Sequence, residues 1–440
     1  FPTSYIPTSG STYQRLADEI TLTNSGIFNP NENTIINEPF GVANGSDTLT
    51  IIGDGNKAER TFVYNSHLSQ TQTNAVAGKT DEFWRWRVIG SSFVLSNFST
   101  DGQVTVDWGD GTIETLTTAE HTFSNGGGYH DIGFRLDSGT YFRPYINNIA
   151  SHDTKVVALG PAPESIKLSG ERAFWGCINL EAFDATVNAT GGTSFQSAWK
   201  SCNSLISFPL INTSSGTSFN QAWRGCSSLT SFPLIDTSSG TDFYQAWRDN
   251  SSLTSFPLIN TSSGTNFGIA WYNCNSLTSF PSIDTSSGTS FNQAWQSCTG
   301  LTSFPLIDTS SGTSFSHAWR DCSSLTSFPL IDTSSGTNFQ ETWYNCSSLT
   351  SFPLINTSSV TNFTGAWKTC STLTSFPLIN TAAGTNFYYA WQNCTGLTSF
   401  PLINTSSGTN FSHTWYNCNS LTSFPLLDTS SGTNFSVAWY

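Results

Sequence analysis

A tryptophan recurs every 24 residues through the C-terminal part of the chain, and this strict period limits what the sequence can fold into. The ladder occupies positions 199, 223, 247, 271, 295, 319, 343, 367, 391, 415 and 439. All ten cysteines follow a matching ladder, at 177, 202, 226, 274, 298, 322, 346, 370, 394 and 418, with Asn250 in the one gap. A 24-residue unit cannot bury an apolar face alone, so the repeat predicts stacked coils, that is, a solenoid.

The apolar residues of each unit follow two different spacings. One half places them at i, i+3, i+4 and i+7, which predicts one face of a short helix: Phe219, Ala222, Trp223 and Cys226. The other half has Leu229, Phe232 and Ile235 around Pro233, which a helix interior excludes, so it predicts an extended segment. The turn-forming residues 236–241 close the unit. We therefore expect an α/β, leucine-rich-repeat-like solenoid whose coils each contain a short strand and a short helix.

Two departures from the repeat are informative. The unit "AFWGCINLEAF" at 173–183 is one residue out of step and has Phe174 in the tryptophan place, so we expect it to cap the N-terminal end. The Gly240 position is glycine in the regular units except for one, which has Val360. Because a β-branched residue resists positive φ, this position should not need the left-handed conformation and should point inward.

The repeat resembles the BspA-type leucine-rich repeat of bacterial and protist surface proteins. Its cysteine, leucine, Asp/Asn-Thr-Ser and Thr-x-aromatic positions all align with that family, and "TSSVTNF" at 357–363 is the most similar copy. The resemblance covers roughly residues 165–440, and we assign residues 161–440 to this solenoid. It implies a non-enzymatic surface protein.

The N-terminal part is predicted to contain mainly β structure, in several separate segments. Residues 81–160 contain short β-like runs, and "VDWGDGT" at 106–112 resembles the hairpin of PKD-like, immunoglobulin-type β-sandwich domains. Asp107 and Asp110 could bind calcium, but we favour turn capping because no further ligands follow at suitable spacing. Residues 1–20 resemble a connector of tailed-phage structural proteins, and residues 21–80 predict a small β-rich region of unassigned role.

Composition excludes several classes of partner. The net charge of −14 argues against nucleic acid and anionic membranes, and no apolar run is long enough to span a bilayer. Aromatic residues make up 14% of the chain, which argues against a charge-rich disordered protein. The chain begins with Phe1 and ends within a repeat, so we expect a piece of a longer polypeptide.

No residue pattern predicts catalysis, a cofactor or a metal site. The six histidines form no ligand pair or catalytic triad, and His317 and His413 fall on a variable position expected to face solvent. The stacked Asp284, Asp308 and Asp332 could be a glycosidase site, yet asparagine fills the same position in half the units, which favours a shared turn-capping role.

The two ladders have alternative interpretations. The cysteines could bind zinc or form disulfides, but we favour buried, reduced thiols, because C-x-x-C pairs are absent and one column offers no unique pairing. The tryptophans could stack on sugars, but we favour a core role, because Trp223 shares its face with Phe219 and Cys226. Ice binding by the regular threonines is a lesser alternative.

Four positions per unit, beside each tryptophan, change from copy to copy while the Ser/Thr turns hardly change. Free drift of exposed positions is one explanation, and recognition of a partner is the other. Tyrosine and arginine, which are favoured in recognition surfaces, are frequent there. The candidate binding residues are Arg224, Tyr244, Arg248, Tyr272, Arg320, Tyr344, Lys368, Tyr388, Tyr389 and Tyr416.

These resemblances imply a non-enzymatic virion appendage, such as a phage tail fibre, on the virion surface or otherwise extracellular. Its expected partners are a host surface glycan or protein receptor and other tail proteins, and a fibre could be a homotrimer. A bacterial cell-surface adhesin of the same repeat family is the first alternative. A structural filament or decoration protein is the second, and a polysaccharide-degrading tail enzyme is a distant further one.

Overall fold

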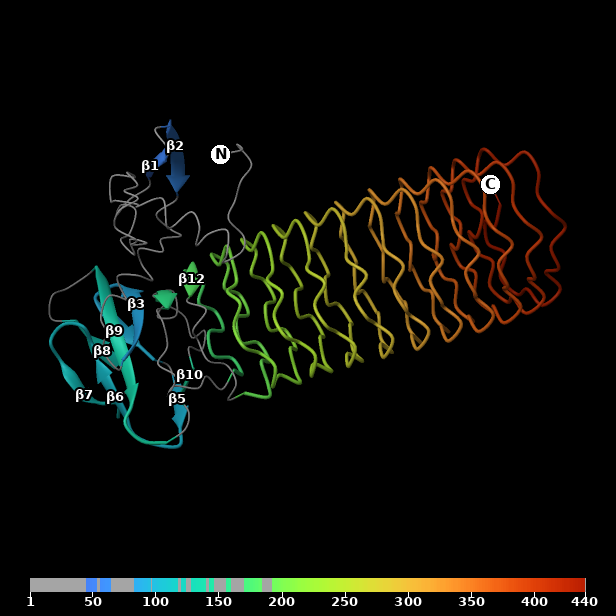
Figure 1. The fold of residues 1–440 in the computed structure, drawn as a ribbon. Helices are drawn as coiled ribbons and strands as arrows, with labels where there is room; N and C mark the ends of the chain where they lie inside the picture. Colours follow the sequence, from blue (N-terminus) through green and yellow to red (C-terminus); the bar gives the residue numbers. More distant parts are fainter. Residues whose placement is uncertain are drawn as a thin grey trace.

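The computed structural model shows a rod of stacked coils with a group of β-strands at its N-terminal end (Figure 1). The structure describes residues 45–53, 56–64, 83–95, 97–117, 120–123, 128–139, 142–145, 156–159, 170–183 and 192–439. The phage-type connector predicted at residues 1–20 lies outside these residues.

The N-terminal strands form four sheets. Strands β1 (Gly45–Gly53) and β2 (Asn56–Tyr64) pair as an antiparallel hairpin within the region predicted to be β-rich. The remaining strands are β3 (Trp84–Ile89), β4 (Ser92–Val94), β5 (Asn97–Thr100), β6 (Val104–Asp107), β7 (Ile113–Thr115), β8 (Glu120–Thr122), β9 (Tyr129–Leu136), β10 (Phe142–Tyr145), β11 (Val156–Leu159) and β12 (Ala182–Phe183). Six form one sheet in the order β12-β11-β3-β9-β6-β7, and β10-β5 and β4-β8 form two small antiparallel sheets.

The six-stranded sheet caps the rod. Its edge strand β12 lies in the first coil and pairs in parallel with β11, whereas the other pairs in the sheet are antiparallel. Phe174 takes the tryptophan place of this coil and lies 6.3 Å from the Trp84 ring and 5.8 Å from the Trp86 ring, centroid to centroid. All three side chains are fully buried. The predicted capping role of the first unit is therefore confirmed, because aromatic residues of the sheet cover the end of the rod's core.

The turn between β6 and β7 shows how its aspartates are used. The Gly109 N–H donates to Asp107 Oδ1 at 2.9 Å, and the Thr112 N–H donates to Asp110 Oδ1 at 3.1 Å. Asp110 Oδ2 also lies 2.9 Å from Nε2 of His121. The favoured turn-capping interpretation is confirmed, while the PKD-like sandwich itself stays a prediction.

The predicted helix is wrong: the described residues contain no helix. The expected buried face is nevertheless present, since Phe219, Ala222, Trp223 and Cys226 are fully buried. The chain passes through left-handed backbone two residues before and two residues after each ladder tryptophan, as at Gln221 (φ 55°) and Gly225 (φ 76°). These residues interrupt right-handed winding, so a run of turns replaces the helix.

Backbone hydrogen bonds in this run alternate between two directions. The N–H groups of Phe219, Gln221, Trp223 and Gly225 donate to carbonyls of the next coil, 23 residues later, at 2.8–2.9 Å. The intervening N–H groups of Ala222, Arg224 and Cys226 donate to carbonyls three residues back. In a helix, N–H groups beyond the first turn bond within the helix itself. Here four of the seven join one coil to the next, so the turns depend on the stack.

The predicted strand is also reduced. The segment containing Leu229, Phe232 and Ile235 is buried at these three positions, but it forms only isolated bridges, such as Ser207 with Ser231. The regular parallel ladder lies elsewhere, one residue wide, and joins Ser218 to Asp242 and so on to Asn434. At a separate place, a buried threonine joins most coils to the next, as where Thr237 Oγ1 donates to the Asn260 carbonyl at 2.5 Å.

Aromatic columns fill the rod. Successive ladder tryptophans stack with ring centroids 5.3–5.8 Å apart and planes within 13° of parallel. Each also meets the phenylalanine of its own coil edge to face, as in Trp223 with Phe232 at 4.9 Å and 77°. Such aromatic pairs contribute about 0.5–1.5 kcal/mol beyond area burial. The tryptophan ladder is therefore core, as favoured from the sequence.

The Gly240 position behaves as predicted. Its φ is not in the left-handed region, and a Cβ built there would lie 2.6 Å from Phe243 Cζ and 2.9 Å from Phe219 Cε2, so it points into the core. Val360 occupies this place fully buried. Phe339, in the coil before it, is turned 90° and 86° from its two stacked neighbours, while the other rings of the column lie within 12° of each other. The turned ring makes room for the valine.

Asn250 is the exception in the cysteine column. It is fully buried, and neither its Oδ1 nor its Nδ2 has a hydrogen-bond partner. The cysteines on either side donate to tryptophan carbonyls of the preceding coil, Cys226 to Trp199 at 3.1 Å and Cys274 to Trp247 at 3.2 Å. Asn250 therefore introduces a local polar cost that the neighbouring coils avoid.

Replacing Asn250 with cysteine should stabilise the rod, because it removes two unpartnered buried polar atoms. We expect a gain of about 1–3 kcal/mol, visible as a higher urea midpoint. The matched control, Cys274→Asn, should lower the midpoint. Equal midpoints for Asn250→Cys and the wild type would contradict this account of the column.

Introducing valine at a regular glycine place should destabilise the rod. In Gly312→Val the new Cβ would lie 2.6 Å from Phe315 Cζ, with the Phe291 ring at 3.0 Å on the other side. We expect a cost of about 1–3 kcal/mol from overpacking, measured by urea unfolding. Val360→Gly should also destabilise, because it leaves space beside the turned Phe339 ring. A Gly312→Val variant as stable as the wild type would show that the column accommodates valine freely.

Candidate binding surface beside the tryptophan ladder

The candidate surface consists of the residues three and two before and one and two after each ladder tryptophan, which we call the Trp-flanking face. All ten predicted binding residues lie on it and are half-buried. The expectation that these positions contact no core is wrong for some of them, since Gln245, Ile269, Ser316 and Ser412 are buried. Side chains of neighbouring coils cover one another there, because the turns bring equivalent positions into adjacent coils.

Every lysine and arginine of residues 192–439 lies in one column of this face, directly after a ladder tryptophan. The five are Lys200, Arg224, Arg248, Arg320 and Lys368. The first three occupy consecutive coils, and we call them the basic row. In a chain of net charge −14, this column holds all the lysines and arginines of residues 192–439 on one line.

The basic row has only partial charge compensation. Lys200 Nζ donates to Gln221 Oε1 at 2.7 Å, and Arg224 Nη1 donates to Gln245 Oε1 at 2.9 Å. Asp249 is the carboxylate nearby, with Oδ2 at 4.0 Å from Arg224 Nε and 3.1 Å from Arg248 Nε. Burial lowers the pKa of Lys200, and Arg224, Arg172 and Arg248 lower it further by repulsion. The row is therefore a site of like-charge repulsion that an anion would relieve.

Two identical clusters occur three coils apart on this face. Arg248 lies over the Tyr272 ring of the next coil at 4.9 Å, and Arg320 lies over Tyr344 at 4.7 Å. In each cluster the asparagine after the tyrosine donates to the aspartate after the arginine, Asn273 to Asp249 at 3.2 Å and Asn345 to Asp321 at 3.0 Å. The signal that could have revealed them was the recurrence of Arg-Asp followed 24 residues later by Tyr-Asn.

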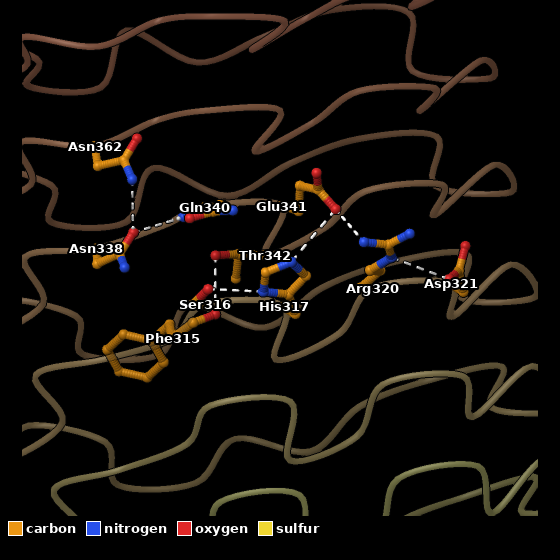
Figure 2. A network of polar contacts seen from close by, with 10 residues as sticks. All are labelled: Phe315, Ser316, His317, Arg320, Asp321, Asn338, Gln340, Glu341, Thr342 and Asn362. Carbon is orange, nitrogen blue, oxygen red and sulfur yellow. Dashed lines mark hydrogen bonds and ion pairs between the residues drawn. The ribbon is translucent and has the colours of Figure 1, made fainter.

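The central part of the face is a polar network around Glu341 (Figure 2). His317 Nε2 lies 3.4 Å from Glu341 Oε2, Arg320 pairs with the same oxygen, and Ser316 Oγ contacts His317 Nδ1 at 2.7 Å. The hydrogen bond with His317 lowers the pKa of Glu341, and the charge of Arg320 adds to this against the opposing effect of burial. The expectation that His317 simply faces solvent is wrong, because it connects two coils.

The C-terminal part of the face is aromatic. Lys368 Nζ lies 5.6 Å from the Tyr344 ring centroid and 4.3 Å from that of Tyr389. Tyr388 and Tyr389 are 3.7 Å apart, and the His413 ring lies 4.9 Å from Tyr389 and 5.7 Å from Tyr416. Rings with polar edges are suited to contacts with amphipathic ligands such as sugars.

The stacked aspartates act as turn caps. The Ser286 N–H donates to Asp284 Oδ1 at 3.0 Å, and the Ser262 N–H donates to Asn260 Oδ1 at 3.1 Å in the same way. Hydrogen bonds from Ser310 lower the pKa of Asp308, which is the opposite of what a general acid requires. The shared turn-capping role of aspartate and asparagine is therefore confirmed.

The cysteine column consists of ten free, buried thiols. Most donate to a tryptophan carbonyl of the preceding coil, as Cys298 does to Trp271 at 3.2 Å. Burial raises the pKa of Cys226, Cys298, Cys370 and Cys418 to about 12. These thiols are core side chains, as favoured from the sequence. Within the described ranges, no group of three or more His, Cys, Asp or Glu residues could hold a metal ion.

Comparison with known proteins gives distant structural similarities. No family model matches the chain, and no curated protein matches it. A solved leucine-rich repeat protein from Bacteroides ovatus is similar over 77% of this chain and 90% of its own, with 16% identity and a TM-score of 0.36. A similarity this low supports no conclusion about the fold or the function of this chain. The 24-residue coils are seen in the structure of the chain itself.

The part of the chain that the structure describes contains no helix that is long and apolar enough to cross a membrane.

Alkaline pH should destabilise the rod through the cysteine column. Because burial raises the thiol pKa above its ordinary 9.0, the unfolded chain loses these protons first, and stability falls as pH rises from about 9 to about 12. Urea midpoints measured from about pH 8 to about pH 11 should fall, and Cys298→Ala should make the fall shallower. The same slope in the wild type and in Cys298→Ala would contradict a contribution from this thiol.

Proposed function

We propose that this chain is a non-enzymatic appendage protein whose rod recognises an anionic glycan on a cell surface through the Trp-flanking face. The observation that carries the proposal is the placement of all five lysines and arginines of residues 192–439 in one column. Nothing in the coil geometry requires a cation there, since Tyr272, Gln296 and Tyr416 occupy the same place in other coils.

The basic row supplies the charge that such a ligand needs. Lys200, Arg224 and Arg248 stand in consecutive coils, about 5 Å apart by the spacing of parallel chains. Carboxylate, sulfate or phosphate groups along a polysaccharide would reduce the repulsion within the row. The tyrosines and His413 in later coils would pack against sugar rings, so one extended chain could lie along the whole face.

The wider biological setting rests on sequence resemblance. The repeat unit resembles BspA-type leucine-rich repeats, "VDWGDGT" resembles a PKD-like domain, and residues 1–20 resemble a tailed-phage connector. Buried free thiols suit a protein assembled in a reducing compartment, as a phage particle is. We therefore favour a tail fibre or similar virion appendage that meets the host surface. A bacterial cell-surface adhesin of the same repeat type is the alternative.

The test compares binding of the full chain to immobilised acidic polysaccharides with its binding to immobilised neutral polysaccharides. Replacing Lys200, Arg224 and Arg248 together with glutamine should weaken binding roughly tenfold to a hundredfold, because each contact contributes about 1 kcal/mol or less. Binding by the wild type should also weaken with added salt.

The controls separate charge from the rest of the rod. Asp284→Asn changes charge on a turn where asparagine occurs naturally, and it should leave binding unchanged. Arg320→Gln combined with Tyr344→Ala tests the middle of the face and should weaken binding less than the basic-row variant does. Equal binding by the wild type and the basic-row variant, or binding only to neutral glycans, would reject the proposed ligand class.

A further inference from the structure

A stripe of exposed leucines runs along the rod away from the Trp-flanking face positions. In nine of the ten coils a leucine follows the proline of the extended half; eight of the nine are 60–63% exposed and the last is 95% exposed. We call these nine residues the leucine stripe: Leu210, Leu234, Leu258, Leu306, Leu330, Leu354, Leu378, Leu402 and Leu426. Isolated exposed leucines are ordinary, but an aligned row of this length is not.

The coil does not need leucine at this place in order to fold. Ser282 occupies it in one coil and is exposed. The neighbours Phe280 and Ile283 remain 6% and 2% exposed, as their equivalents Phe232 and Ile235 do in a coil with leucine. The fold therefore tolerates serine, and the leucine side chain adds nothing to the core beneath it.

Several exposed threonines and serines that stay constant have a reason within the fold. Thr241 Oγ1 donates to the Thr217 carbonyl at 3.1 Å, and Thr254 Oγ1 donates to Thr230 at 3.2 Å. Ser238 caps its turn through Asp236. Positions without such a bond, on the Trp-flanking face, differ from coil to coil. Leucine is thus the one large exposed side chain that is retained without a bond or a core contact to retain it.

We propose that the leucine stripe is the contact through which a second copy of this chain packs side by side with the first. A row with a leucine in nine of ten coils is matched along its length by a partner with the same period, and the chain itself has that period. A partner of globular shape would cover only a few coils. Rods paired through their stripes would remove the leucines of both copies from water.

The area fits a homo-oligomer. Complete burial of a leucine contributes about 1.5–3 kcal/mol at about 25 cal/mol per Å², which corresponds to an area of about 60–120 Å². Nine leucines at this exposure therefore present an apolar area of roughly 300–650 Å² to water. The adjacent prolines and threonines would bring the contact near the roughly 800 Å² per partner of a stable interface. A patch of this size is at the upper end of what monomeric proteins leave exposed, and such patches often serve a function.

The charges near the stripe argue against an anionic membrane as the occupant. All five lysines and arginines of residues 192–439 lie in the column after the tryptophans, so none flanks the leucines. Exposed aspartates and asparagines, such as Asp236 and Asn260, lie two positions after the leucines along the chain. Anionic lipid would be repelled by these aspartates. Between two copies they would lie at a solvated rim, where salt screens the repulsion.

The test is the solution mass of the full chain, measured by light scattering after gel filtration and by sedimentation velocity across micromolar concentrations. The wild type should show a mass that is a multiple of the monomer's and should associate more strongly in sulfate salts. A variant with Leu234→Ser, Leu258→Ser, Leu330→Ser and Leu354→Ser should run as a monomer. Ser282 shows that each of these coils can still fold, and circular dichroism and urea midpoints check this.

A control variant carries four changes on the Trp-flanking face, Asn220→Ser, Gln296→Ser, Asn292→Ser and Gln392→Ser. It should keep the wild-type mass. A monomeric wild type, or a leucine variant that associates as strongly as the wild type, would overturn the proposal. A mass that increases only in the presence of lipid vesicles would overturn it as well, because it would identify a membrane as the occupant.

Discussion

The alternation of backbone N–H groups between a coil's own turns and the next coil is the constraint on which the rest of the rod depends. Phe219, Gln221, Trp223 and Gly225 each donate across to the following coil, and the donors between them close local turns. The left-handed residues on either side of each tryptophan make this possible. For a residue other than glycine, that conformation costs about 1–2 kcal/mol. The cost is offset only when a neighbouring coil supplies the acceptors, so a single coil has no stable form.

This arrangement separates the residues of a coil into two groups. Trp223, Cys226 and the phenylalanines must match their equivalents above and below, and they hardly vary. The side chains at Gln221 and Arg224 leave the coil at its edge and meet only their neighbours on the same face. A rod built in this way can change its surface chemistry coil by coil without disturbing its core, which suits a surface that must match a particular ligand.

Much of this core could be predicted from the sequence, but the local backbone could not. The 24-residue period, the buried aromatic ladders, the inward Gly240 place and the capping role of Asp284 follow from residue types and spacing. The prediction of a helix was wrong because consecutive turns joined by residues with left-handed backbone also produce the burial pattern i, i+3, i+4, i+7. The column containing Gly225, Asn273 and Asn345 carried a signal for such corners, since glycine and asparagine tolerate positive φ.

The sequence located the candidate surface, but it did not predict which side chains contact one another there. Comparing copies identified the variable positions, yet the contact of Arg248 with Tyr272 depends on placing residues 24 apart side by side. The leucine stripe escaped notice for a related reason. Leu234 lies between buried Phe232 and Ile235, and only the geometry of the turn shows that its side chain faces water.

The tryptophan column has a consequence for how the rod handles light. Its indoles lie nearly parallel, with centroids 5.3–5.8 Å apart from one coil to the next. Excitation absorbed by one ring would pass readily to the next, so the column would act as a single extended chromophore. A quencher that reaches only the terminal Trp439, which is 46% exposed, would dim rings far inside the rod.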